Sequence, residues 1–124
     1  MRPTYLNLHY HLILSTRHRE LAPSLRGRVQ EYLGGLVRGF GGRNHGVGGT
    51  GDEVHLLVSL RPTQCLAEFV REFKKSSAAW IRESCRVRGF AWRRGYSALT
   101  VDAAGSAAVH KYLATPKEPI SGIS

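Results

Sequence analysis

Two segments of the chain alternate apolar and polar residues with a period of two, and this pattern limits the fold more than any other feature. In the first segment, residues 5–16, one face carries five apolar side chains: Leu6, Leu8, Tyr10, Leu12 and Leu14. In the second, residues 53–60, one face carries four: Val54, Leu56, Val58 and Leu60. Side chains two residues apart in a strand point the same way. Both segments therefore predict strands with one buried face, which another layer must cover.

Apolar residues at three- and four-residue steps predict the helices that form this layer. One helix opens at Pro23 and Ser24 and stops at Gly41 and Gly42, and a second follows Thr63 as its N-cap. We also expect a weak strand at 43–49, a short strand at 96–101, and a last helix from Ser106 that Pro116 ends.

The expected order is therefore β-α-β-β-α-β, plus a C-terminal helix. It predicts an α+β, ferredoxin-like (RRM-like) fold: a four-stranded antiparallel sheet with the first two helices on one face. The second face of the sheet is left for function.

Length and composition favour one small domain spanning residues 1–124, with a mobile tail at 115–124. Only Cys65 and Cys85 are present, and we interpret both as buried or half-buried thiols, as in a reducing cytoplasm. The first residues do not read as a signal peptide, and no stretch has the length of a membrane helix. We therefore expect a cytoplasmic protein without a membrane partner.

A glycine-rich stretch, GVGGTG at residues 46–51, matches a dinucleotide-binding fingerprint. That motif places a pyrophosphate at the start of a helix, whereas a strand follows here. We interpret the match as accidental and expect no nucleotide cofactor.

Three side chains can carry chemistry. Glu53 and His55 lie two apart in a strand, so they share a face and can hold a divalent cation, although an ordinary edge strand with solvated Glu53 gives the same spacing. Tyr112 lies in the last helix, where the spacing alone more often describes a half-buried core tyrosine. We expect His9 and His11 to pack or face solvent.

The charge balance points to a polyanionic partner. The chain has 18 Lys and Arg against 9 Asp and Glu, which gives a formal charge of +9. Basic residues form three clusters, of which the last is interleaved with Trp92 and Tyr96: Arg17 and Arg19; Lys74 and Lys75; and Arg86, Arg88, Arg93 and Arg94. Phosphate contacts combined with base stacking are typical of single-strand binding. The charge alone also fits a solvated basic surface or an anionic membrane surface, and the placement of the basic residues has to decide between them. The candidate DNA-binding residues are Arg17, Arg19, Lys74, Lys75, Arg93 and Arg94.

Five pieces, in this order and spacing, resemble the single-tyrosine H-U-H transposases of the IS200-like insertion-sequence family: LHYHLILSTRHR, EYLGGLVR, GDEVHLLVSLRP, FAWRRGYSALTV and AVHKYL. The resemblance covers roughly residues 5 to 115. It implies a homodimer that binds hairpins in single-stranded DNA, cuts with Tyr112 as nucleophile, and keeps a 5′-phosphotyrosine link that is reused for rejoining.

The resemblance also implies a Mg²⁺ or Mn²⁺ site, because a phenol is a poor nucleophile at neutral pH without a cation to polarise the phosphate. In the family two histidines flank one apolar residue, and Glu53, Val54 and His55 stand at those positions. A further family ligand, usually glutamine, falls on Pro116, which has no donor atom.

Three functions are open, the second of which is suggested by the departures at Glu53 and Pro116. The first is an active transposase with an altered cation site. The second is an inactive or domesticated descendant that binds DNA hairpins without cutting. The third is an RNA-binding domain of the same fold, although the aromatic strand typical of RRM proteins is missing.

Overall fold

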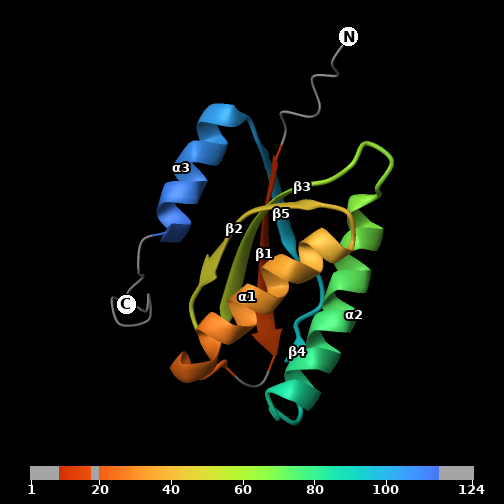
Figure 1. Ribbon diagram of the computed structural model, residues 1–124, viewed down its shortest axis with the longest axis vertical. Helices are drawn as coiled ribbons and strands as arrows, with labels where there is room; N and C mark the ends of the chain where they lie inside the picture. Colours follow the sequence, from red (N-terminus) through yellow and green to blue (C-terminus); the bar gives the residue numbers. More distant parts are fainter. Residues whose placement is uncertain (1–8, 18–19, 115–124) are drawn as a thin grey trace.

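The computed structural model describes residues 9–17 and 20–114, which form an α+β fold around one antiparallel sheet (Figure 1). The elements, in order, are β1 (His9–Arg17), α1 (Pro23–Gly39), β2 (Arg43–Gly49), β3 (Glu53–Ser59), α2 (Leu66–Ser84), β4 (Ala91–Trp92), β5 (Ser97–Val101) and α3 (Ala103–Ala114). The predicted fold class is confirmed. Arg19 and the tail at 115–124, which includes Pro116, lie outside the described residues.

The sheet has β1 at its centre. β1 pairs with β3 on one side and with β4 and β5 on the other, and β2 pairs with the outer side of β3; all these pairs are antiparallel. The order β2-β3-β1-β5 is that of the expected four-stranded sheet. The two-residue strand β4 adds a fifth strand that was not predicted, because two residues are too few to show an alternating pattern.

α1 and α2 cover one face of the sheet, and the core lies between them and the sheet. Of the predicted inward residues, Leu6 and Leu8 lie outside the described residues, and Tyr10 and Leu60 are partly buried against the core. The other five are buried: Leu12, Leu14, Val54, Leu56 and Val58. Each stabilises the fold by about 1.5–3 kcal/mol when buried, so a register slip of one residue, which would turn them all outward, is strongly disfavoured. The same register fixes Glu53 and His55 on the opposite face.

The start of α2 differs from the prediction. The helix begins at Leu66, after a turn in which the Gln64 amide donates to the Arg61 carbonyl at 3.0 Å, so Thr63 is not the N-cap. Cys65 takes that position without a side-chain cap bond, and it is exposed rather than buried. The turn delays the helix because the Gln64 side chain also donates to the Phe40 carbonyl at 2.7 Å, which holds the loop against the end of α1.

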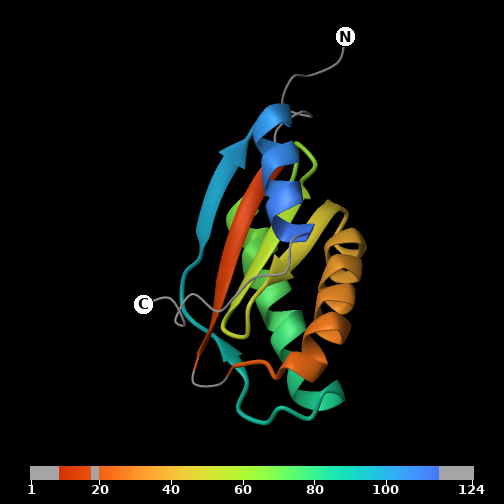
Figure 2. The ribbon, with the colours of Figure 1, turned by 90° about the vertical axis from the view of Figure 1, so that its left-hand side faces the viewer.

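α3 lies on the other face of the sheet: in Figure 2 it lies in front of the strands, with α2 behind them and α1 to their right. It begins at Ala103 rather than Ser106, because the Asp102 carboxylate accepts the Gly105 backbone N–H at 2.8 Å and so caps the helix. The second face is therefore partly covered by α3. No helix within the described ranges combines the length and apolar character that crossing a membrane requires.

Two glycines of β2 let α3 approach the sheet closely. A Cβ atom on Gly46 would lie 3.2 Å from Leu113 Cδ1, and one on Gly48 would lie 3.1 Å from both the Cδ2 atom and the carbonyl oxygen of Leu113. Leu113 is buried against this bare strand. The glycine-rich stretch thus seats a helix, and, as expected, a strand rather than a helix follows it.

Candidate active site

The turn between β2 and β3 sets the position of Glu53. Gly49 has a φ of 139°, and a Cβ atom there would overlap the Glu53 carbonyl oxygen, so only glycine fits without distortion. The Thr50 amide donates to the same carbonyl at 2.9 Å. This tight turn makes Glu53 the first residue of β3.

Glu53 and His55 form a hydrogen-bonded pair on the sheet face that carries α3. His55 Nε2 lies 3.1 Å from Glu53 Oε1. The imidazole is buried, whereas the carboxylate side chain is 48% exposed and so open to solvent and to a substrate. The two side chains that the sequence grouped by spacing therefore point together.

His11 extends this pair into a chain of three. On the neighbouring strand β1, its Nε2 lies 3.0 Å from His55 Nδ1. Burial lowers the pKa of His11, and the charge of His55 lowers it further. The expected packing of His11 is therefore confirmed, and it includes a hydrogen bond to His55 that the sequence did not reveal. The alternation places His11 on the correct face, but the contact depends on the register between β1 and β3, which the sequence does not reveal.

The other histidine of that segment, His9, belongs to a separate group. Its ring stacks on His45 at 3.9 Å between centroids, and His45 Nε2 lies 2.6 Å from Ser59 Oγ. Burial lowers the pKa of His9. The pKa of His45 is lowered mainly by burial and further by the charges of His9, Arg43 and His110.

Tyr112 comes to this face from α3. Its ring centroid lies 6.0 Å from that of His55, and the residue is 48% exposed. It is therefore not a core tyrosine; Leu113, the next residue, makes the buried contact with β2. One chain brings together the three residues selected from the sequence: Glu53, His55 and Tyr112.

The donor atoms of Glu53 and His55 fit a divalent cation. Adjacent ligands in an octahedral shell with bonds of about 2.1 Å lie about 3 Å apart, and the two atoms are 3.1 Å apart. A carboxylate oxygen and an imidazole nitrogen suit Mg²⁺ or Mn²⁺. Within the part of the chain that the structure describes, no three His, Cys, Asp or Glu side chains form a ready-made metal site. Water and substrate oxygens would have to complete the shell.

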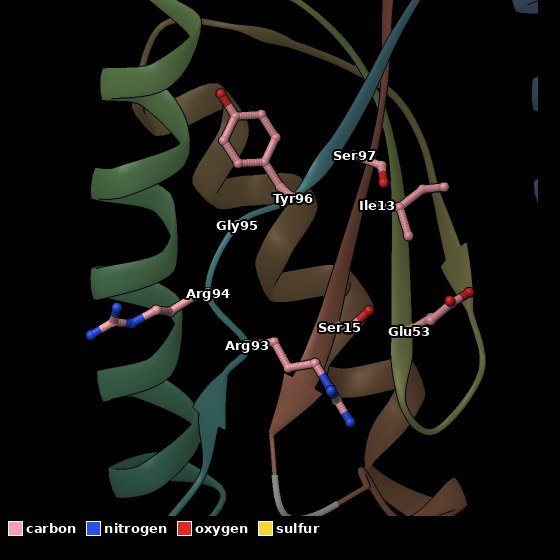
Figure 3. Close-up of a pocket in the computed structure, with 8 residues that line it drawn as sticks. All are labelled: Ile13, Ser15, Glu53, Arg93, Arg94, Gly95, Tyr96 and Ser97. Carbon is pink, nitrogen blue, oxygen red and sulfur yellow. The ribbon is translucent and has the colours of Figure 1, made fainter.

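A shallow pocket of about 310 Å³ adjoins Glu53. Figure 3 shows its floor, where Ile13 and Ser15 of β1, Glu53 of β3 and Ser97 of β5 lie side by side. The wall is the arginine loop, residues 93–96, which connects β4 to β5. Its volume is at the small end of the range of ligand pockets, about 300–1,000 Å³.

The arginine loop is held by hydrogen bonds to β1 and α2. The Arg93 amide donates to the Ser15 carbonyl at 2.8 Å, and Arg93 Nε donates to the Thr16 carbonyl at 3.1 Å. Lys74 Nζ donates to the carbonyls of Arg93 and Gly95 at 2.7 and 2.6 Å. Burial lowers the pKa of Lys74. Lys74 thus braces the loop, in addition to any contact with a ligand.

The remaining candidate DNA-binding residues fall into two places. Arg17 pairs with Ala91 of β4, so it lies next to the arginine loop, at the corner of the sheet that also holds Glu53. In Figure 3 the Arg93 side chain points toward the end of β1, and that of Arg94 points away from the pocket. Lys75 is exposed on α2.

Comparisons with known proteins give the family and the fold of the chain. The family model described as "Transposase IS200 like" matches residues 4–115. The crystal structure of a candidate transposase from Deinococcus radiodurans R1 is similar, with a TM-score of 0.68 and 25% identity, covering 86% of this chain and 88% of that one. A REP-associated tyrosine transposase, solved bound to a REP hairpin, has a TM-score of 0.63 and 12% identity, covering 91% and 68% respectively. No curated protein matches the sequence.

Proposed function

The chain belongs to the IS200-like transposase family, and from this premise we propose that it binds unpaired DNA beside a hairpin and cuts it with Tyr112. The observation that carries the proposal is the approach of Tyr112 to His55, with 6.0 Å between ring centroids, beside the hydrogen-bonded Glu53. The structurally similar protein bound to a REP hairpin supports the choice of DNA.

The proposed reaction exchanges one phosphodiester bond for another. The Tyr112 hydroxyl oxygen attacks the phosphorus and loses its proton, while the bond to the 3′ oxygen breaks and that oxygen takes up a proton. The products are a 5′-phosphotyrosine and a free 3′ hydroxyl. Attack of a 3′ hydroxyl on this link rejoins DNA and releases Tyr112, so no nucleotide cofactor is needed.

Glu53 and His55 would hold the Mg²⁺ or Mn²⁺ ion of the site. When bound, the ion withdraws charge from the scissile phosphate and so favours attack by the phenol. The residues of the chain do the rest: α3 presents Tyr112, and β3 presents the two ligands on a rigid strand.

The pocket beside Glu53 is the proposed path of the unpaired strand. Arg17 and Arg93 would contact phosphates there, and Tyr96, which is 39% exposed, offers a ring for base stacking. Lys75 and Arg94 extend the basic surface around it. The formal charge of +9 favours this binding through counterion release.

A pool of labelled hairpin oligonucleotides with randomised unpaired flanks, incubated with Mn²⁺, tests the proposal. We expect an SDS-resistant protein–DNA adduct that Tyr112→Phe abolishes while hairpin binding is kept. Tight binding without an adduct would instead support the inactive descendant. This alternative is suggested by Glu53, which stands where the family has a histidine. Preference for an RNA hairpin of the same sequence would support the RNA-binding alternative.

Variants at Glu53 test the cation site. Glu53→Leu removes a ligand, and we expect it to abolish adduct formation. Glu53→His supplies a nitrogen ligand instead and restores the two-histidine pattern, so adduct formation should be at least that of the wild type. Equal activity of all three proteins would refute a role for this side chain.

The homodimer implied by the family stays a prediction. Because Tyr112 lies beside His55 of its own chain, one chain can supply both parts of the proposed site. Light scattering of the purified protein, with and without hairpin DNA, gives its oligomeric state.

A further inference from the structure

His11 contacts the buried end of the Glu53–His55 pair. It approaches His55 from β1, with 3.0 Å between His11 Nε2 and His55 Nδ1 and ring planes tilted by 41°. We propose that His11 is a positioning residue: it pairs with His55 Nδ1 and so lets His55 take the tautomer whose Nε2 lone pair faces Glu53 and can bind a cation. This inference rests on the cation site of the proposed function.

Two neutral imidazole rings hold two ring protons between them. Each neutral imidazole has one N–H donor and one acceptor nitrogen. Without a cation, His55 donates its Nε2–H to the Glu53 carboxylate, and its Nδ1 then accepts the Nε2–H of His11. Both hydrogen bonds, from His11 to His55 and from His55 to Glu53, are made in this arrangement. However, His55 then has no lone pair directed at the carboxylate.

Cation binding requires the opposite arrangement. The Nε2 proton of His55 leaves to water, His55 Nδ1 takes the proton of His11 Nε2, and His11 Nδ1 takes one proton from water. Two protons are held by the two rings before and after, so neither ring becomes charged. His55 then donates Nδ1–H to His11 Nε2 and presents its Nε2 lone pair beside the carboxylate.

A partner that can both donate and accept serves both arrangements. A lysine or arginine could donate but not accept, and would keep His55 in the wrong tautomer. Hydrogen-bond partners of a metal-binding histidine typically change metal affinity by about 10–100-fold when they are removed.

The test measures Mn²⁺ affinity of the full chain without DNA, by the electron paramagnetic resonance signal of free Mn²⁺. We expect His11→Leu to weaken binding by about 10–100-fold. His11→Gln should recover most of the affinity, because the end of a glutamine side chain reaches the place of Nε2 and both donates and accepts. His9→Leu is the matched control, a histidine two residues away on the same face whose ring stacks on His45, and it should change affinity less than about twofold.

A second measurement follows the tautomer itself. Long-range ¹H–¹⁵N spectra of the imidazole rings should show His55 changing from the Nε2–H to the Nδ1–H form when Mg²⁺ is added, and His11→Leu should lose this change. Thermal denaturation and circular dichroism check that each variant is folded.

The outcomes separate this inference from the proposed function. If folded His11→Leu binds Mn²⁺ as tightly as the wild type, or if His9→Leu weakens binding equally, the positioning role is wrong although the cation site stands. If the wild type binds no Mn²⁺, the cation site and the role of His11 are both wrong. Normal Mn²⁺ binding that depends on His11, without any DNA adduct, would contradict the cutting activity alone.

Discussion

Replacing Gly48 with alanine tests whether the close packing of α3 against the glycines of β2 positions Tyr112. The added Cβ would lie 3.1 Å from the carbonyl oxygen and Cδ2 of Leu113 and 3.3 Å from its Cβ. Ordinary contact begins at 3.4 Å. The helix must therefore move outward by about 0.3 Å at Leu113, the neighbour of Tyr112, because two of the three crowded atoms cannot rotate away.

The size of the effect follows from where α3 lies. Overpacking in a well-packed core costs about 1–3 kcal/mol. We expect about 1 kcal/mol, at the low end, because α3 is an outer element that can shift without disturbing the core beneath α1 and α2. This corresponds to about a fivefold rise in the opening of α3. Since a misplacement of about 1 Å can slow a reaction about 100-fold, a shift of this size should slow adduct formation about tenfold or less.

Amide hydrogen exchange of residues 103–114 measures the opening, and the adduct assay measures the rate. Gly27→Ala in α1 is the control, because a Cβ there meets nothing within 4 Å; it should raise stability by about 0.5–1 kcal/mol and leave α3 unchanged. If α3 of the Gly48→Ala variant exchanges its amide hydrogens at the wild-type rate, the proposed close packing of α3 on β2 is refuted. Faster exchange with an unchanged adduct rate would show that this packing does not position Tyr112.

Three further predictions address the supports of the site. Lys74→Met removes two hydrogen bonds to the arginine loop, so hydrogen exchange should speed up in that loop and stability should fall by about 1 kcal/mol; Lys75→Met, on the exposed side of α2, should change neither. Trp92→Phe loses the indole N–H bond to buried Ser77 and leaves a small void, so urea denaturation should show a loss of about 1–3 kcal/mol. The pKa of His45 is lower in the folded chain than its ordinary 6.5, so below about pH 6.5 the unfolded chain binds more protons. The melting temperature should therefore fall as the pH drops from about 7 to 5, and less steeply in His45→Gln; an equal slope in both proteins would contradict this.

The sequence by itself determined the parts of the molecule that depend on local pattern. The period of two in residues 53–60 placed Val54 in the core and Glu53 and His55 together on the other face, because alternation in a strand needs no knowledge of its neighbours. The helical spacing placed α1 between Pro23 and its glycine stop for the same reason. Both follow from residues a few positions apart.

Only the tertiary structure decided which of these residues meet. His11 and His55 are 44 positions apart in the chain, and they touch because β1 and β3 pair in one register. Tyr112 reaches His55 because Gly46 and Gly48 leave space for Leu113, a role that a glycine-rich sequence does not reveal. Lys74 and the arginine loop likewise meet across the edge of the sheet. Contacts between distant segments depend on strand register and on the space that small residues leave. A local sequence pattern predicts neither.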